Sequence, residues 1–337
     1  MPQDIGFDLP FPLNISPDLE RARSRNLDWV REQGLVDTGE MLAWYSMWDM
    51  PKLAAYGFPY ATGDELDLCT DAMAFFFLFD DQFDGPLGHS PDRVAHACRG
   101  FTDLIHGNRS GRSTNPLTNA FADVWDRCRQ SASARWQARA ACDWEYYFAA
   151  HAHEAINRVR GVPSPMPEYV EVRRGVAAMD ITISLGERAA MIDVPPAAFY
   201  SPHLRIMRQI AVELPFMCND VYSLEKEESR GDMDNLVLVL EQEQHISRTE
   251  AIEQAKAEIA RRSARFLSLQ HGVAGMCAQL GLNDQQHSEV NRYIEVMSAF
   301  TRGYHQWETE TRRYTGAADI VPASGPGYFQ DLLDHQT

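Results

Sequence analysis

The sequence predicts an all-α protein. Helix start signals recur along it, beginning with Ser16-Pro17, where the proline takes a first helical position, and Gly34 follows as a stop. No stretch alternates apolar and polar residues in the manner of a strand, and the chain has no internal repeat. A length of 337 residues allows two domains, but no linker divides the chain, so we expect one domain over 1–337. Within it, the segments of about 1–15 and about 315–337 are expected to be peripheral.

Further helices are predicted in order along the chain. Residues 62–65, Thr-Gly-Asp-Glu, have the spacing of a capping box and open a helix that runs into an acidic cluster. The Gly-Pro pair at 85–86 ends that helical region, and the Ser-Pro pair at 90–91 starts the next helix. Residues 107–116 are rich in turn formers and form the clearest loop. The Ser-Pro pair at 201–202 starts a helix that carries a second polar cluster.

Composition limits the function. The chain has 48 acidic and 31 basic residues, a net charge of −17, which argues against nucleic acid as a partner. Its six cysteines form no CxxC pair, as expected for reduced thiols in a cytoplasmic protein. The N-terminus lacks the basic region of a signal peptide, and no apolar stretch reaches about 18 residues. We therefore expect a cytoplasmic monomer or homodimer without a membrane span.

The most informative stretch is 75–84, where an apolar helix runs into three carboxylates. At about 100° per residue, Asp80 and Asp84 fall on one helical face, one turn apart. Phe76 and Phe77 lie one turn earlier on the same side. Carboxylate oxygens suit Mg²⁺, which often shares its ligand shell with a substrate phosphate, and aromatic faces suit an apolar or cationic ligand.

A second cluster strengthens this interpretation. Asn219, Ser223 and Glu227 follow one another at intervals of four and so share one helical stripe. They offer an amide oxygen, a hydroxyl and a carboxylate, which are again hard ligands for Mg²⁺. The apolar run at 210–218 precedes them and looks like a buried helix, so a polar stripe that continues it needs partners.

Together the two clusters resemble the paired metal-binding motifs of bacterial class I terpene cyclases, and most closely those of sesquiterpene synthases of the pentalenene synthase type. The spacing of about 140 residues between Asp80 and Asn219 is similar to that family. Arg173 stands where the family has an arginine that senses diphosphate, and Arg313-Tyr314 matches a family pair that binds the same group. The resemblance implies the class I terpenoid synthase helical bundle with a central apolar cavity.

The resemblance also implies the activity: Mg²⁺-dependent ionisation of a linear prenyl diphosphate, farnesyl diphosphate first, and cyclisation to a sesquiterpene hydrocarbon or alcohol. About three Mg²⁺ ions are implied as cofactor. The implied metal ligands are Asp80, Asp84, Asn219, Ser223 and Glu227, with Asp81 a helper. The implied diphosphate ligands are Arg173, Lys226, Arg313 and Tyr314. Phe76, Phe77 and Trp307 are expected to stabilise the cation, whereas Phe75 and Phe79 are expected to pack. The resemblance also implies that a backbone carbonyl near Ala177 aids ionisation.

Three alternatives stay open. A diterpene synthase would use geranylgeranyl diphosphate. A chain-elongating prenyl diphosphate synthase carries a second Asp-Asp-x-x-Asp, whereas here Asn219, Ser223 and Glu227 take that place. A non-catalytic helical isoprenoid-binding protein is disfavoured by the intact set of ligands. The pair His151 and His153 lies about 200° apart on a helix and cannot share one ion.

Overall fold

The computed structural model describes residues 5–36, 38–108, 113–314 and 332–333. Within these ranges the chain is helical and contains no strand, which confirms the all-α prediction. The helices are α1 (Leu19–Glu32), α2 (Gly39–Ser46), α3 (Met50–Gly57), α4 (Gly63–Asp80), α5 (Pro91–Ile105), α6 (Pro116–Arg129), α7 (Ala134–Arg160), α8 (Met166–Val176), α9 (Met179–Ala189), α10 (Pro196–Phe199), α11 (Pro202–Ser229), α12 (Leu236–Gln244), α13 (Arg248–His271), α14 (Val273–Gln279) and α15 (Asp284–Glu310). Two 3₁₀ turns, η2 (Asp81–Phe83) and η3 (Pro86–His89), follow α4.

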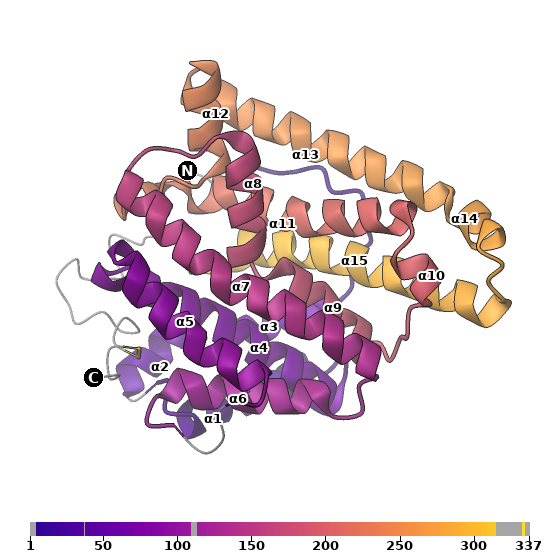
Figure 1. The fold of residues 1–337 in the computed structure, drawn as a ribbon, viewed down its shortest axis with the longest axis horizontal. Helices are drawn as coiled ribbons and strands as arrows, with labels where there is room; N and C mark the ends of the chain where they lie inside the picture. The colour runs from indigo at the N-terminus through magenta and orange to yellow at the C-terminus, as the bar shows by residue number, and fades with distance from the viewer. Residues whose placement is uncertain (1–4, 37, 109–112, 315–331, 334–337) are drawn as a thin grey trace.

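The helices surround α4, which contacts α1, α3, α6 and α9. Most of its residues are apolar and buried on every side, as expected for a helix inside a bundle. In Figure 1, α13 runs along one edge of the bundle, with α11 and α15 beside it and α5 and α7 crossing on the side nearest the viewer. Helices α11 and α15 pack against each other, and α11 also packs against α13.

The start of α4 differs in detail from the predicted capping box. Thr62 is the N-cap residue, but its side chain makes no capping hydrogen bond. The backbone N–H of Gly63 instead donates to the Asp18 carboxylate at 2.8 Å. A carboxylate from the start of α1 therefore stabilises the positive end of α4 and joins the two helices.

Helix α11 contains Pro215 in its interior. A proline has no N–H, so the Ala211 carbonyl one turn earlier loses its helical partner. The Thr301 hydroxyl of α15 lies 3.5 Å from that carbonyl. The chain stays helical after Pro215 as far as Ser229, so Asn219, Ser223 and Glu227 all lie on α11.

The helix breaks between α8 and α9. Ala178 has a φ of 56°, a left-handed conformation that an L-residue adopts at a cost. Helix α8 lies tight against α7 because Gly175 has no side chain: a Cβ there would lie 2.3 Å from the Ala150 Cβ. This close packing fixes the helix on which Arg173 stands.

The N-terminal segment is more than peripheral, contrary to the expectation for residues 1–15. Leu9 and Phe11 are buried in the core, and the Tyr222 hydroxyl donates to the Ile5 carbonyl at 2.6 Å. The ring of Phe7 packs on His305. Most of the predicted C-terminal tail, 315–337, lies outside the described residues.

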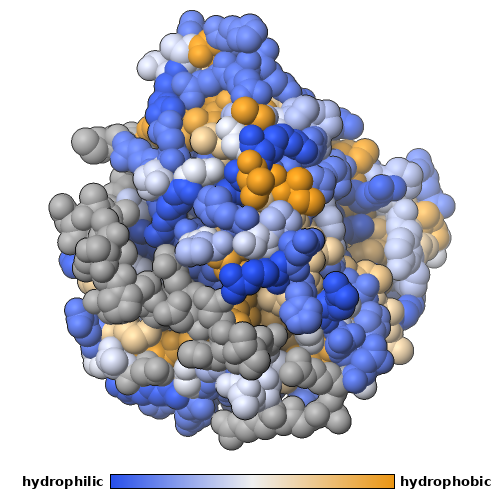
Figure 2. Space-filling model, turned by 60° about the vertical axis from the view of Figure 1, so that its left-hand side comes forward, coloured by the Kyte–Doolittle hydropathy of each residue, from blue (hydrophilic) through white to orange (hydrophobic). Residues whose placement is uncertain are grey.

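The face of the molecule turned forward in Figure 2 is mainly hydrophilic, with small separate apolar patches. Across the described ranges, no helix combines the length and apolar character needed to cross a membrane. The six cysteines are free thiols, and all but Cys142 are buried.

Candidate active site

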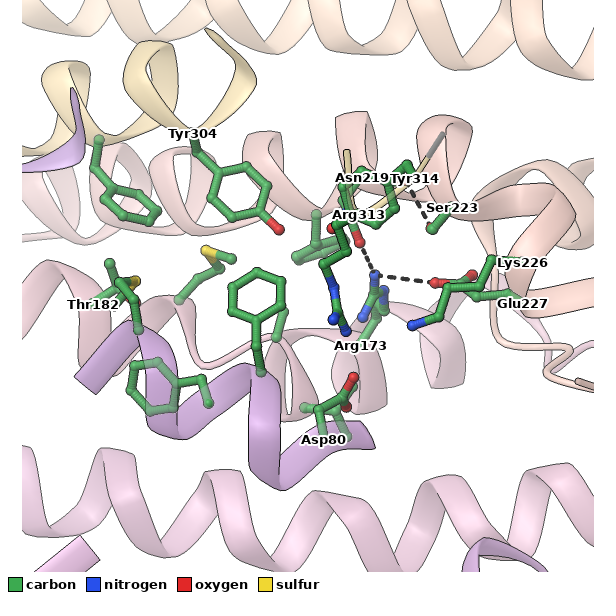
Figure 3. Close-up of a pocket in the computed structure, with 18 residues that line it drawn as sticks. Asp80, Arg173, Thr182, Asn219, Ser223, Lys226, Glu227, Tyr304, Arg313 and Tyr314 are labelled. Atoms are coloured by element: carbon green, nitrogen blue, oxygen red, sulfur yellow. Dashed lines mark hydrogen bonds and ion pairs between the residues drawn. The ribbon is translucent and has the colours of Figure 1, made fainter. Parts of the chain in front are cut away.

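Most of the predicted residues, although they come from distant parts of the chain, line one cavity. Its deep part is mainly apolar and its mouth is charged (Figure 3). The apolar part is lined by Met73, Phe76, Phe77, Val176, Ala177, Met179, Thr182, Phe216, Phe300 and Tyr304. The mouth is lined by Asp80, Arg173, Asn219, Ser223, Lys226, Glu227, Arg313 and Tyr314.

Asp80 is the last residue of α4 and faces this cavity. Its side chain keeps 43% exposure, and its nearest ion-pair partner is His151, whose Nε2 lies 3.8 Å from Oδ1. Although burial opposes it, the proximity of His151 and Lys226 holds the pKa of Asp80 below its ordinary value. The carboxylate is therefore ionised and open to a ligand in the cavity.

Asp81 and Asp84 have other partners, because α4 ends at Asp80 and the chain continues as a 3₁₀ turn. Asp81 accepts hydrogen bonds from both terminal nitrogens of Arg313, at 2.6 and 3.1 Å. Asp84 is paired with Arg230 and lies 3.4 Å from the Lys226 ammonium. The predicted common helical face of Asp80 and Asp84 is therefore wrong. Asp84 does not line the cavity, and its charge is neutralised by two cations.

The second cluster forms the opposite wall, as its helical stripe predicts. Asn219 and Ser223 are buried on α11, and the Ser223 hydroxyl donates to the Asn219 carbonyl at 2.8 Å. One turn further, Glu227 accepts a hydrogen bond from the Asn235 amide at 2.8 Å. Burial raises the pKa of Glu227 to about 7, against the opposing effect of Arg173.

Arg173 links α8 to this wall. Its Nε donates to Asp220 at 2.7 Å and one terminal nitrogen donates to the Asn219 amide oxygen at 2.7 Å. The same guanidinium lies 3.8 Å from Glu227. On its other side, the Asn219 amide donates to the Tyr314 hydroxyl at 2.9 Å. The structure thus brings together residues that are 46 and 95 positions apart in the sequence.

The aromatic residues divide into cavity and core. Phe76 and Phe77 line the cavity as predicted, and Phe75 and Phe79 are fully buried among other rings. Trp307 does not line the cavity, contrary to the prediction. It is fully buried behind Phe77, with ring centroids 5.4 Å apart, because its indole N–H donates to the Trp48 carbonyl at 2.8 Å.

The break between α8 and α9 forms part of the cavity wall. Ala177 lines it, and no hydrogen bond reaches the Ala177 carbonyl from any part of the chain that the structure describes. Thr182, also on the wall, donates its hydroxyl proton to the Ala178 carbonyl at 2.9 Å. A carbonyl dipole without a donor at this point suits a positive charge in the cavity.

Two cations near the mouth were missed by the sequence argument. Arg230 stands four residues after Lys226, and both cations lie near Asp84. This spacing of one helical turn could have predicted that they share a side. Arg158 of α7 is buried and pairs with Asp232 at 2.8 Å. The mouth of an acidic protein is therefore rich in guanidinium and ammonium groups, as an anionic ligand requires.

The donor set at the mouth fits a hard divalent metal ion. Asp80, Asn219, Ser223 and Glu227 supply only oxygen ligands, which Mg²⁺ prefers. No three His, Cys, Asp or Glu side chains converge anywhere in the described ranges, so the soft or nitrogen-rich ligand sets typical of zinc are not seen there.

Comparison with known proteins agrees with this site. Residues 71–265 match the family model described as terpene synthase family 2, C-terminal metal binding. A pentalenene synthase of Streptomyces avermitilis is 36% identical, with 98% of this chain and 99% of the relative covered. A (−)-β-caryophyllene synthase of Saccharothrix espanaensis, described as cyclising (2E,6E)-farnesyl diphosphate, is 34% identical over 99% of this chain and 95% of the relative.

Solved structures show the same fold. The crystal structure of germacradien-4-ol synthase from Streptomyces citricolor superposes with a TM-score of 0.84 at 35% identity. The alignment covers 92% of this chain and all of that chain. The predicted helical bundle is thereby confirmed.

Proposed function

Because the chain belongs to the terpene synthase family, we propose that it ionises farnesyl diphosphate with the help of Mg²⁺ and cyclises it to a sesquiterpene. The observation that supports this most is the meeting of Asp80 with Asn219, Ser223, Glu227 and Arg173 at the mouth of one apolar cavity. We infer that the whole chain, 1–337, works as a single domain, with diphosphate released as the second product.

The metal would be held by Asp80 on one wall and by Asn219, Ser223 and Glu227 on the other. About three Mg²⁺ ions would supply positive charge to the leaving diphosphate, a Lewis-acid contribution. Asp84 is left out of this set because Arg230 and Lys226 already neutralise its carboxylate.

The chain's own cations bind and orient the diphosphate. Arg173 and Arg313 present guanidinium groups that match phosphate oxygens, and Lys226 and the Tyr314 hydroxyl add donors. Arg313 is held in place by Asp81 and by the faces of Trp48 and Phe77, at 4.2 and 4.8 Å. The leaving group is therefore bound at the mouth, away from the apolar end.

The apolar end protects and guides the cation. Phe76 and Phe77 line the cavity with aromatic rings, and the Ala177 carbonyl supplies a dipole close by. Trp307 supports Phe77 from behind and acts only through it. These walls exclude water, which would otherwise quench the cation before ring closure.

Farnesyl diphosphate is favoured over longer substrates by the relatives, among them the synthase described as cyclising it. Geranylgeranyl diphosphate is the second candidate, and the same cavity would have to hold five more carbons.

The test is incubation with Mg²⁺ and geranyl, farnesyl or geranylgeranyl diphosphate, with and without isopentenyl diphosphate, followed by gas chromatography and mass spectrometry. We expect a cyclic sesquiterpene from farnesyl diphosphate alone. A longer diphosphate, formed only with isopentenyl diphosphate, would instead identify a chain-elongating synthase. Tight binding of every substrate without turnover would identify a non-catalytic binding protein.

A further inference from the structure

A second cavity lies on the far side of α11 from the active site. It has a volume of about 410 Å³ and lies between α8, α11, α12 and α13. Met166 and Val170 of α8, Phe216 and Met217 of α11 and Leu240 of α12 give it largely apolar walls. Nothing in the proposed reaction uses this space.

The charged groups around this cavity are already paired with one another. Buried Glu213 holds both Arg174 and Arg262. Glu258 accepts hydrogen bonds from Arg261 at 2.8 Å and from Arg262 at 2.7 Å. Each of these guanidinium groups has a carboxylate partner, so an anionic head group would have to displace one. A neutral ligand fills the cavity without breaking an ion pair.

The wall of this cavity is also a support of the active site. The Phe216 side chain lines both cavities. Tyr169 and Leu236 line the second cavity, and the Tyr169 hydroxyl and the Leu236 N–H both donate to one oxygen of Asp220. The other oxygen of Asp220 accepts from Arg173 at 2.7 Å. A ligand that displaces Tyr169 or Leu236 therefore displaces the carboxylate that holds Arg173.

We propose that this second cavity binds a neutral, apolar terpenoid of the size released by the active site, and that its occupancy lowers turnover through Asp220 and Arg173. The identity of the ligand rests on the proposed function, whereas the existence of the site rests on the cavity alone. The exposed amides of Gln244 and Gln254 at the rim offer hydrogen bonds to a terpenoid hydroxyl.

The binding experiment uses farnesol, a neutral alcohol, as the probe. The enzyme is saturated with Mg²⁺ and the thio analogue of farnesyl diphosphate, which fills the active site and ionises slowly, and farnesol is then titrated by calorimetry. We expect one equivalent of farnesol to bind to this blocked enzyme. No binding to the blocked wild-type protein would overturn the proposal, whatever the variants do.

Two variants fill the second cavity from opposite walls. Val170→Phe acts from α8 and Ala257→Phe from α13, and each should weaken farnesol binding by about tenfold or more. Val159→Phe is the matched control, because Val159 is 57% exposed on α7 and lines neither cavity. Equal farnesol affinity in all three variants, with unchanged melting temperatures, would place the bound farnesol elsewhere and overturn the proposal.

Inhibition kinetics with farnesyl diphosphate as substrate test whether a ligand in the second cavity lowers turnover. In the wild-type enzyme farnesol should lower kcat as well as raise KM, and in Val170→Phe it should raise KM alone. Purely competitive inhibition in both proteins would contradict the coupling through Asp220. If the protein turns over no prenyl diphosphate, the calorimetric result without analogue, compared between wild type and Val170→Phe, still decides whether the site exists.

Discussion

Asp80 and Asp81 are neighbours in the sequence, yet their carboxylates serve different parts of the molecule. Asp80 ends α4 and faces the cavity, whereas Asp81 begins the 3₁₀ turn and binds Arg313. Asp220 differs in the same way from its neighbour Asn219. The buried Asp220 carboxylate accepts hydrogen bonds from Arg173 and Tyr169 and does not face the cavity. Chemical type alone therefore does not identify a ligand; the direction given by the backbone does.

The two kinds of phenylalanine on α4 make a direct residue-scale test. Phe77→Ala should change the product mixture, with less cyclised hydrocarbons increasing, because Phe77 lines the cavity. Phe79→Ala is the matched control: Phe79 is fully buried outside the cavity, so the change should cost about 3–5 kcal/mol of stability and leave the product ratio unchanged. Product profile and melting temperature are measured on the same samples. An unaltered product mixture for Phe77→Ala would show that Phe77 does not direct the cyclisation.

His305 gives a pH-dependent contribution to stability. Burial lowers its pKa from 6.5 to about 4. The neighbouring Glu308, 3.7 Å away, is itself buried, and burial raises the pKa of that carboxyl well above its ordinary value. The unfolded chain therefore binds a proton between these values that the folded chain does not, so stability falls as the pH drops from about 6.5 to about 4. The full effect is roughly 3 kcal/mol.

The measurement is urea unfolding of wild type and His305→Gln from pH 8 to pH 4. The difference in unfolding free energy between the two proteins should shrink or reverse in acid, since glutamine carries no proton to bind. A difference that stays constant across this range would show that His305 is not held neutral. Comparing the two proteins cancels the contributions of other buried groups, such as Asp71 and Asp143, whose pKa values burial raises to about 7.

At the scale of elements, interruptions in helices shape the site. The 3₁₀ turn after α4 directs Asp81 and Asp84 to cations, and the break between α8 and α9 leaves the Ala177 carbonyl without a donor among the described residues. Regular helices would have used both groups in their own hydrogen bonds or on their own surfaces. Groups of the proposed site therefore lie at the ends of helices, where the regular hydrogen bonding stops.

The left-handed conformation of Ala178 predicts an unusual response to glycine. Ala178→Gly should stabilise the protein by about 0.5–1 kcal/mol, because it removes a Cβ from a conformation that costs an L-residue about 1–2 kcal/mol, offset in part by a freer unfolded chain. Ala260→Gly, in the middle of α13, should instead destabilise by about 1 kcal/mol. Chemical denaturation measures both. A loss of stability in both variants would show that the break carries no strain.

The sequence predicted the helices that carry the site, but it did not predict several of the contacts between their side chains. The apolar run before Asp80 and the polar stripe from Asn219 to Glu227 have strong local patterns, and both helices were predicted. The end of α4 one turn early, the burial of Trp307 and the pairing of Asp84 with Arg230 depend on tertiary neighbours. No spacing rule in one stretch of sequence contains that information.

At the scale of the whole molecule, the link between α11 and α12 is tied to residues that are distant in the sequence. Arg230 reaches Asp84 after α4, Asp232 pairs with Arg158 of α7 at 2.8 Å, and the Asn157 amide donates to Asp234 at 2.7 Å. The described structure thus holds residues 229–235 against two other elements. We predict that this segment becomes mobile when no ligand is bound.

Hydrogen exchange tests how firmly these contacts hold residues 229–235. Asp232→Asn should speed exchange across 229–235 by about tenfold to a hundredfold, since a charge-assisted hydrogen bond contributes about 1.5–3 kcal/mol, and Mg²⁺ with diphosphate should restore protection. Glu253→Gln, which removes an exposed ion pair with Lys256, is the control and should change nothing there. Identical exchange in both variants would show that the Arg158–Asp232 pair does not hold the segment.

The central claim, that both polar clusters act on one diphosphate with a divalent metal, is tested most directly by Mg²⁺-dependent release of diphosphate from farnesyl diphosphate. Asn219→Ala and Glu227→Gln should each lower the rate by about a hundredfold or more, and a chelator should abolish it. Glu228→Gln is the matched control, because Glu228 is exposed and pairs with Arg248. Asp220 cannot serve as a control, since it holds Arg173. Chelator-resistant release, or equal rates in Glu227→Gln and Glu228→Gln, would contradict the account.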